Sequence, residues 1–119
     1  MYGLPRDVDL TFFAGKYIMQ VCIGANDLIL HFDDSALSVL IMSKIACKGP
    51  GAVLREYETY RDAAKVVVSF LEEIVELARG DEKGTLVLEF KNGGRIEVYD
   101  DSKEYESYVI TYRDIRIVV

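Results

Sequence analysis

The sequence predicts a single α+β domain, residues 1–119, in which two antiparallel β-meanders of about six or seven strands flank one central amphipathic helix packed on the sheet. Three observations predict this class. Short segments of alternating apolar and polar residues recur towards both ends of the chain, tight-turn sequences separate them, and one stretch of helical periodicity lies between. Because the 119 residues are 50% hydrophobic and 29% charged, the chain can build a core without disulfides or metal.

The first meander is predicted from three alternating segments, 16–23, 28–33 and 37–41. Residues 24–27 and 33–35 are turn sequences, since Gly, Asn and Asp accept the backbone angles of tight turns. Consecutive strands joined by tight turns pair in antiparallel fashion. On the first strand we expect one face to carry Tyr17, Met19, Val21 and Ile23.

The central helix is predicted to run from Tyr60 to Arg79. Thr59 and Asp62 have the spacing of a capping box, and Gly80 stands where a C-terminal helix glycine is expected. The apolar residues of this segment cover roughly 200° of the helix, which is more than one buried face requires. We therefore expect a deeply embedded helix or one covered on a second side by another subunit. The opposite face would carry the acidic residues Glu72, Glu73 and Glu76.

The second meander is predicted from a hairpin, 86–98, turning at Asn92-Gly93-Gly94, and from a closing hairpin around Arg113-Asp114. The stretch 86–98 followed by Tyr105-Glu106-Ser107-Tyr108 resembles a group of small, mostly bacterial α+β domains of unknown function. These carry a Leu-x-Phe-x-x-Gly hairpin before a Tyr-Glu-Ser element. The resemblance covers about the last 35 residues. It implies a fold and no catalytic residues, and it suggests immunity-type proteins that are encoded beside toxins.

The inventory of reactive side chains excludes several classes of function. One His and two Cys are too few for a multi-ligand zinc site, and no phosphate-binding glycine loop is present. A net charge of −6 argues against nucleic acid as the partner. A Cys22–His31 pair across neighbouring strands is geometrically possible, but we interpret both residues as structural. We predict no catalytic, cofactor-binding or metal-binding residues and no enzymatic activity.

The N-terminus lacks the basic and apolar regions of a secretory signal, and no apolar run approaches the ~20 residues of a membrane span. Two cysteines at this spacing form no disulfide framework, so we expect free thiols. The sequence thus favours a cytoplasmic protein without membrane association.

With these classes of function excluded, the main feature of the sequence is its abundance of acidic residues and tyrosines. Such a surface suits a basic protein partner, because tyrosine side chains supply contact area and carboxylates attract a positively charged surface during association. The leading hypothesis is a non-enzymatic protein-binding module, in its most specific form an immunity-type inhibitor of a basic toxin. Two alternatives stay open: a small-molecule-binding or enzymatic domain with a pocket between sheet and helix, and a homo-oligomeric structural module. The predicted partner-binding residues are Glu72, Glu73, Glu76, Tyr99, Tyr105 and Glu106.

Overall fold

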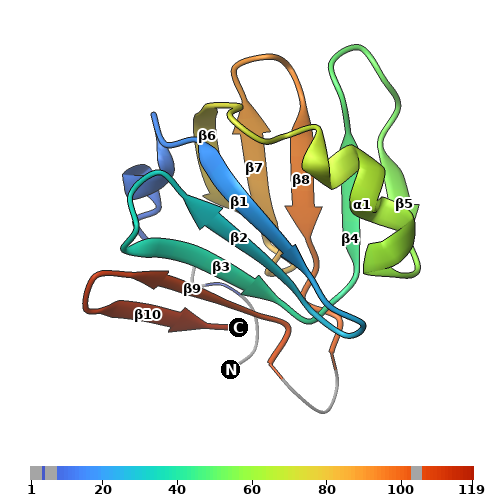
Figure 1. Cartoon of the computed structure of the whole chain (residues 1–119). Coiled ribbons are helices and arrows are strands. Elements are labelled where there is room, and N and C mark those ends of the chain that lie inside the picture. The colour runs from blue at the N-terminus through green and yellow to red at the C-terminus, as the bar shows by residue number, and fades with distance from the viewer. Residues whose placement is uncertain (1–3, 5–7, 103–105) are drawn as a thin grey trace.

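The computed structural model describes residues 4, 8–102 and 106–119, and it shows two five-stranded antiparallel sheets facing each other (Figure 1). The first sheet has the order β1-β2-β3-β9-β10, and its strands are Ile18–Ile23, Leu28–Phe32, Leu37–Ile41, Tyr108–Tyr112 and Ile115–Val118. The second sheet has the order β5-β4-β8-β7-β6. Its strands, from β4 to β8, are Ile45–Lys48, Arg55–Tyr57, Val75–Gly80, Leu86–Phe90 and Arg95–Val98.

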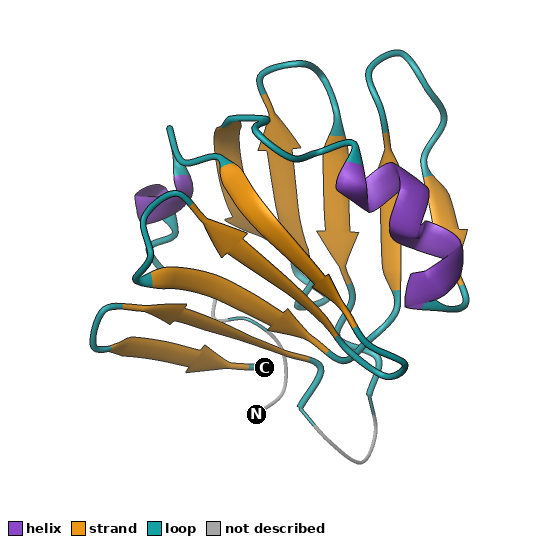
Figure 2. Ribbon diagram, in the orientation of Figure 1, coloured by secondary structure: helices purple, strands orange, loops and turns teal. Residues whose placement is uncertain are grey.

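Two short helices complete the described part of the chain: a 3-10 helix, Thr11–Phe13, and the α-helix α1, Tyr60–Val68 (Figure 2). The α+β prediction, the first meander and both C-terminal hairpins are confirmed. The described residues form ten strands, more than the six or seven expected, because residues 45–48, 55–57 and 75–80 are also strands.

The predicted helix from Tyr60 to Arg79 is wrong in its second half. Helix α1 ends at Val68, the backbone turns through Glu72 at a positive φ of 69°, and residues 75–80 form strand β6 paired with β7. Gly80 is consequently the last residue of a strand and not a helix cap. The N-terminal half was predicted correctly: Thr59 accepts a hydrogen bond from the Asp62 N–H at 3.1 Å, as a capping residue does.

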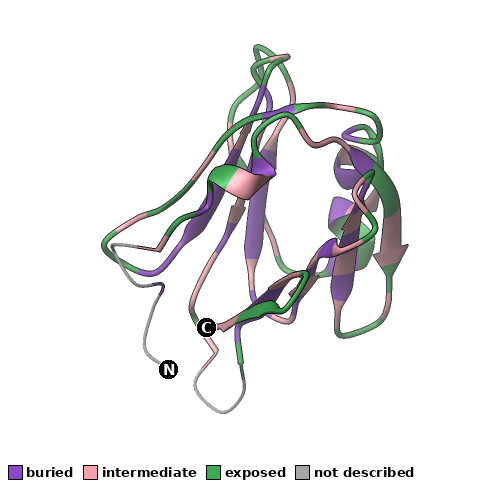
Figure 3. Cartoon of the chain, turned by 90° about the vertical axis from the view of Figure 1, so that its left-hand side faces the viewer, coloured by how far each residue is buried: buried purple, intermediate pink, exposed green. Residues whose placement is uncertain are grey.

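The core lies between the sheets, where the alternating residues of the central strands meet (Figure 3). In β2 and β3 every second residue is buried, as one-sided strands require. Strand β1 departs from the expected alternation because a bulge lies between Ile18 and Gln20, so Ile18 is buried and Met19 is exposed. Helix α1 covers the open side between β1 and β5, burying Tyr60, Ala63 and Val67.

The sheets are joined along one side, where the start of β1 meets the segment that leads into β6. The Gly15 N–H donates to the Val75 carbonyl at 2.9 Å, and the Val75 N–H donates to the Lys16 carbonyl at 2.8 Å. A third bond joins the Glu72 N–H to the Ile18 carbonyl at 2.7 Å. We call this junction of residues 15–19 with residues 71–75 the seam.

Replacing Tyr108 by Phe should lower the free energy of unfolding by about 1–3 kcal/mol. Tyr108 is fully buried, and its hydroxyl donates to the Gly84 carbonyl at 2.6 Å, so the variant leaves a buried acceptor without its donor. Urea denaturation measures the loss. The matched control is Tyr57→Phe, whose hydroxyl has no hydrogen-bond partner among the described residues, and an equal loss there would contradict this account.

Candidate functional site

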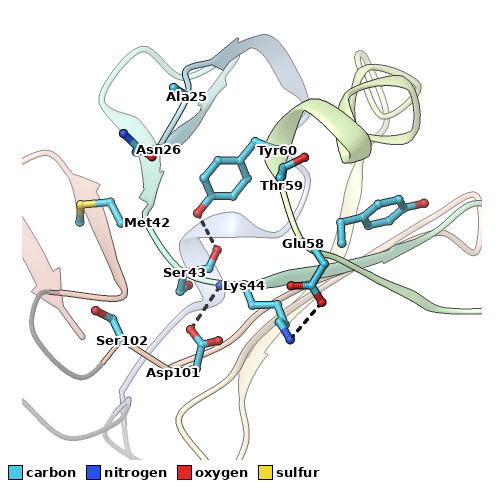
Figure 4. Close-up of a pocket in the computed structure, with 11 residues that line it drawn as sticks. Ala25, Asn26, Met42, Ser43, Lys44, Glu58, Thr59, Tyr60, Asp101 and Ser102 are labelled. Carbon is cyan, nitrogen blue, oxygen red and sulfur yellow. Dashed lines mark hydrogen bonds and ion pairs between the residues drawn. The ribbon is translucent and has the colours of Figure 1, made fainter.

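A cleft of about 440 Å³ opens where the chain crosses from β3 in the first sheet to β4 in the second (Figure 4). Ser43 and Lys44 form this crossing. Tyr60, at the start of α1, lines the cleft from another side, and Asp101 lines it from the loop after β8. Ala25 and Asn26, from the turn between β1 and β2, also line it, so four segments distant in sequence contribute to one cleft.

Hydrogen bonds fix these segments to one another. The Tyr60 hydroxyl donates to the Ser43 carbonyl at 2.5 Å, and the Lys44 N–H donates to Asp101 Oδ1 at 3.2 Å. The Tyr99 N–H donates to the Lys44 carbonyl at 3.0 Å, which continues the β4–β8 pairing past the end of the strands. The floor of the cleft is thus an extended segment held on both sides.

The charges of the cleft are predominantly negative. Lys44 Nζ lies 3.5 Å from a Glu56 oxygen and 3.8 Å from a Glu58 oxygen, so its ammonium is shared between two carboxylates. Asp101 makes no ion pair within the described residues. Burial, and then the negative charges of Asp101 and Asp27, raise the pKa of Tyr60 to about 12, so its phenol stays protonated and donates.

One polar atom of the cleft stands out. Ser43 is only 7% exposed, and its Oγ has no hydrogen-bond partner among the described residues. Buried hydroxyls are nearly always hydrogen-bonded, because leaving one unpaired costs free energy. Ser43 Oγ is itself closed to solvent, so it is an unsatisfied buried atom beside the cleft and not a group that a ligand in the cleft contacts directly.

Among the described residues of the cleft, the Ser43 hydroxyl has no hydrogen bond to a base, so it lacks the contact that activates a nucleophile. His31 and Glu106 are not among the residues that line it. In the first sheet His31 pairs with Gln20, and Cys22 pairs with Ile29, so Cys22 and His31 are diagonal neighbours and not directly opposed. Both cysteines are free, as expected, and in the described chain no group of three or more His, Cys, Asp or Glu side chains could hold a metal ion.

The predicted acidic residues Glu72, Glu73 and Glu76 do not share a helix face. Glu72 and Glu73 lie in the turn between α1 and β6, and Glu76 lies in β6 itself. Glu72 and Glu76 are exposed, and Glu73 is half-buried. None of the three forms an ion pair with another described residue, so they remain together on one segment as unneutralised carboxylates.

The other predicted partner-binding residues are placed apart from this segment. Tyr99 follows β8 and is half-buried, with its hydroxyl 3.3 Å from a Glu97 oxygen. Burial, and then Glu97, raise the pKa of Tyr99 to about 12. Glu106 is exposed and forms no ion pair with a described residue; Arg95 pairs with Glu89 and Glu97, and Arg113 pairs with Asp34. Tyr105 lies outside the described residues.

Sequence reasoning missed a set of exposed apolar side chains at the seam and beside it, which we call the seam patch. Its members are large apolar side chains between 36% and 55% exposed: Met19, Val68, Leu71, Ile74 and Leu77. Part of the signal was present, since Val68 widened the apolar arc of the predicted helix, while Leu71, Ile74 and Leu77 were placed on its main apolar face. It was assigned to the wrong secondary structure. Glu72, Glu73 and Glu76 are interleaved with the patch along the chain.

Comparison with known families identifies the chain. A family model described as a family of unknown function, DUF6188, matches residues 11–119. The chain belongs to this family. The DUF6188 match covers both sheets, α1 and the cleft, and so extends well beyond the C-terminal residues that carried the resemblance. No curated protein and no solved structure matches the chain. For this DUF6188 member, no described helix is both long and apolar enough to cross a membrane.

Proposed function

We propose that this DUF6188 member is a non-enzymatic, cytoplasmic protein-binding module that acts by occupying a basic protein partner. An immunity-type inhibitor of a basic toxin is its most specific form. The observation that carries the proposal is the seam patch, where five exposed apolar side chains are interleaved with three carboxylates that have no ion-pair partner in the described chain.

The apolar part supports a binding role because exposed apolar residues gathered in one region mark interaction surfaces more often than scattered ones do. Three of the patch residues, Leu71, Ile74 and Leu77, lie in the segment 69–78, in which only Phe70 and Val75 are buried. Burying side chains of this size against a partner contributes roughly 25 cal/mol per Å² of apolar area. The patch can thus supply the affinity of the interface.

The acidic part supports a basic partner. Carboxylates without a cation of their own raise the negative potential around the apolar contact, which accelerates association with a positively charged surface and disfavours an acidic one. The net charge of −6 adds to this effect at long range. The same arrangement argues against self-association through the patch, since two copies would bring their carboxylates together.

The absence of a converging nucleophile and base in the cleft supports a role in binding over one in catalysis. A second candidate function, small-molecule binding, is favoured by the 440 Å³ cleft, whose lining includes Lys44, Tyr60 and Asp101. A homo-oligomeric module is the third, and light scattering across a range of concentrations tests it directly. A concentration-dependent mass that a charge in the seam patch abolishes, as in Leu77→Lys, would favour that reading over the heterologous partner.

Reversing two charges in the patch, Glu72→Lys with Glu76→Lys, should weaken partner binding at least tenfold, or about 1.4 kcal/mol. The loss should be largest at low salt, because exposed charges are screened by ions. The measurement is the affinity of the protein recovered from native cells on the immobilised wild-type chain, repeated with each variant at several salt concentrations.

The matched control is the double variant Glu82→Lys and Asp114→Lys, which changes the net charge equally at exposed sites outside the patch. Its binding should change much less. If both double variants bind equally well, the carboxylates of the patch play no part in recognition and the proposal fails.

A further inference from the structure

We infer that two copies of the chain associate through the outward face of the first sheet, with their β3 strands facing each other and a twofold axis running along these strands. The inference does not depend on the proposed function, because the face is centred on β3 and contains none of the seam patch residues. Such a dimer leaves residues 68–77 of each copy free to bind a basic partner.

An unbroken row of apolar side chains crosses the outward face of this sheet. The strand register places one apolar residue of each strand beside the next, in the order Cys22, Ile29, Leu40, Val109 and Val118. These residues alternate along their strands with those that face the core, so they point away from it. Four of them are half-buried, and Val109, which lies between Leu40 and Val118, is buried.

Neither described helix covers this face. Helix α1 packs against β1, β4 and β5, and the 3-10 helix packs against β6 and stacks on the inward-facing rings of Phe32 and Tyr112. The second sheet lies on the opposite side of the first (Figure 1). The solvated face of an antiparallel sheet normally carries polar residues, so a continuous apolar row on it indicates a surface that another molecule covers.

The charges of this face favour a second copy of the chain as its occupant. A polar row runs beside the apolar one and consists of Gln20, His31, Ser38, Thr111 and Arg116. Neither row contains a carboxylate, although the chain has 20 Asp and Glu residues. Two copies with a net charge of −6 each repel one another least where no carboxylates meet. The seam patch, by contrast, would bring carboxylates together.

A twofold axis along β3 places the apolar row of one copy on the apolar row of the other. Because β3 is the central strand of the sheet, this axis sets β1 opposite β10 and β2 opposite β9 of the second copy. Leu40 then faces Leu40 of the second copy, and Ile29 faces Val109 of the second copy. The strands of the two sheets stay roughly aligned, as they do in packed sheets.

The same axis makes the polar row complementary to itself. Ser38 faces Ser38 of the second copy, so that one hydroxyl donates and the other accepts. Gln20 lies opposite Arg116 of the second copy, whose guanidinium donates to the amide oxygen of Gln20. His31 lies opposite Thr111, which pairs an imidazole nitrogen with a hydroxyl. No like charges are opposed anywhere in this row.

The face is large enough for a weak dimer. In a five-stranded sheet the strands lie about 4.8 Å apart, and strands of this length give a face of roughly 24 Å by 17 Å on each copy. The relief of the side chains makes the accessible area larger than the flat area. The two faces together therefore approach the lower limit of specific interfaces, about 1,200 Å². We expect a dissociation constant in the micromolar range.

The direct test is sedimentation equilibrium of the wild-type chain and two lysine variants from about 1 μM to about 1 mM. The wild-type mass should rise from that of a monomer towards that of a dimer. Leu40→Lys should weaken the association at least tenfold, because it places two ammonium groups at the apolar centre of the interface. Leu77→Lys is the matched control, since it puts the same charge on an exposed leucine of the seam patch and should change nothing. A wild type that stays monomeric, or a dimer lost only in Leu77→Lys, would overturn the inference.

Two glutamate variants in the polar row test the direction of the axis, and they also decide the matter if Leu40→Lys does not fold. Ser38→Glu brings two carboxylates together on the axis, so it should weaken the dimer at least tenfold at low salt and less at high salt. Gln20→Glu changes the net charge equally but sets a carboxylate opposite Arg116, and should strengthen the dimer about twofold or more. If both variants weaken the dimer equally, net charge alone governs the association and the inference fails.

Capture of a partner from native cells separates this inference from the proposed function. A wild type that captures a basic partner and yet stays monomeric would remove the dimer and leave the proposed function standing. A dimer that responds to Leu40→Lys and to the two glutamate variants as expected, but captures no basic partner, would keep the dimer and remove the proposed function.

Discussion

Replacing Phe70 by alanine should lower the free energy of unfolding by about 3–5 kcal/mol, the range for truncating a fully buried aromatic side chain. Phe70 is 1% exposed, and its ring lies 4.7 Å from that of Phe90 between centroids. Gly94 belongs to the same contact, since a Cβ at that position would lie 2.6 Å from the Phe70 ring. Urea denaturation followed by circular dichroism measures the loss.

The control for Phe70→Ala is Val68→Ala, two residues earlier, where the side chain is 45% exposed. Its expected cost is well below 1 kcal/mol, because little buried contact is removed. If the two variants lose similar amounts, Phe70 does not hold the end of α1 in the core as the structure indicates.

The helix was predicted too long because contacts between distant residues, and not the local sequence pattern, determine the structure of its second half. Residues 60–79 have apolar spacing that suits a helix, and local pattern alone cannot distinguish a helix from a strand that begins within it. The segment contains β-branched residues at Val66, Val67, Val68, Ile74 and Val75, which favour strands. Pairing with β7 and burial of Val75 decide the outcome, and these are contacts between residues far apart in sequence.

The parts of the fold that sequence predicted correctly are the parts set locally. Asn92-Gly93-Gly94 fixes a hairpin through its own turn geometry, with Gly93 at a positive φ of 91°. The alternation of β2 and β3 appears in the sequence because one face of the sheet is buried and the other is not. Strand β5, with three residues and little burial, carries no comparable pattern.

The candidate site was only partly predictable for the same reason. Glu72, Glu73 and Glu76 were singled out from charge alone, and the structure keeps them on one segment but changes their setting. The cleft had no sequence signal, because Ser43, Tyr60 and Asp101 meet only when the crossing between the sheets places them together. An unpaired buried hydroxyl is a property of packing that no motif records.

The alkaline limit of stability should lie in the range where Cys47 and the buried tyrosines ionise. Burial raises the pKa of the Cys47 thiol from 9.0 to about 12, since the thiolate would lose its hydration in the core. The folded state therefore holds this proton more tightly than the unfolded state. Its contribution to stability is complete below pH 9 and is lost as the pH rises from 9 towards 12.

At pH 11 this one thiol should reduce the free energy of unfolding by about 2–3 kcal/mol relative to pH 8, at 1.36 kcal/mol for each pKa unit. Above pH 10 the loss steepens, because burial also raises the pKa of Tyr108 and of Tyr60, the latter to about 12. Urea midpoints collected from pH 7 to 11 give the slope. Cys47→Ala should flatten the curve most clearly between pH 8.5 and 9.5, where the tyrosines, with an ordinary pKa of 10.0 in the unfolded chain, are still mostly protonated in both states. An unflattened curve would mean that Cys47 ionises in the folded protein as readily as in the unfolded chain, and that the interior between the two sheets admits water at this strand.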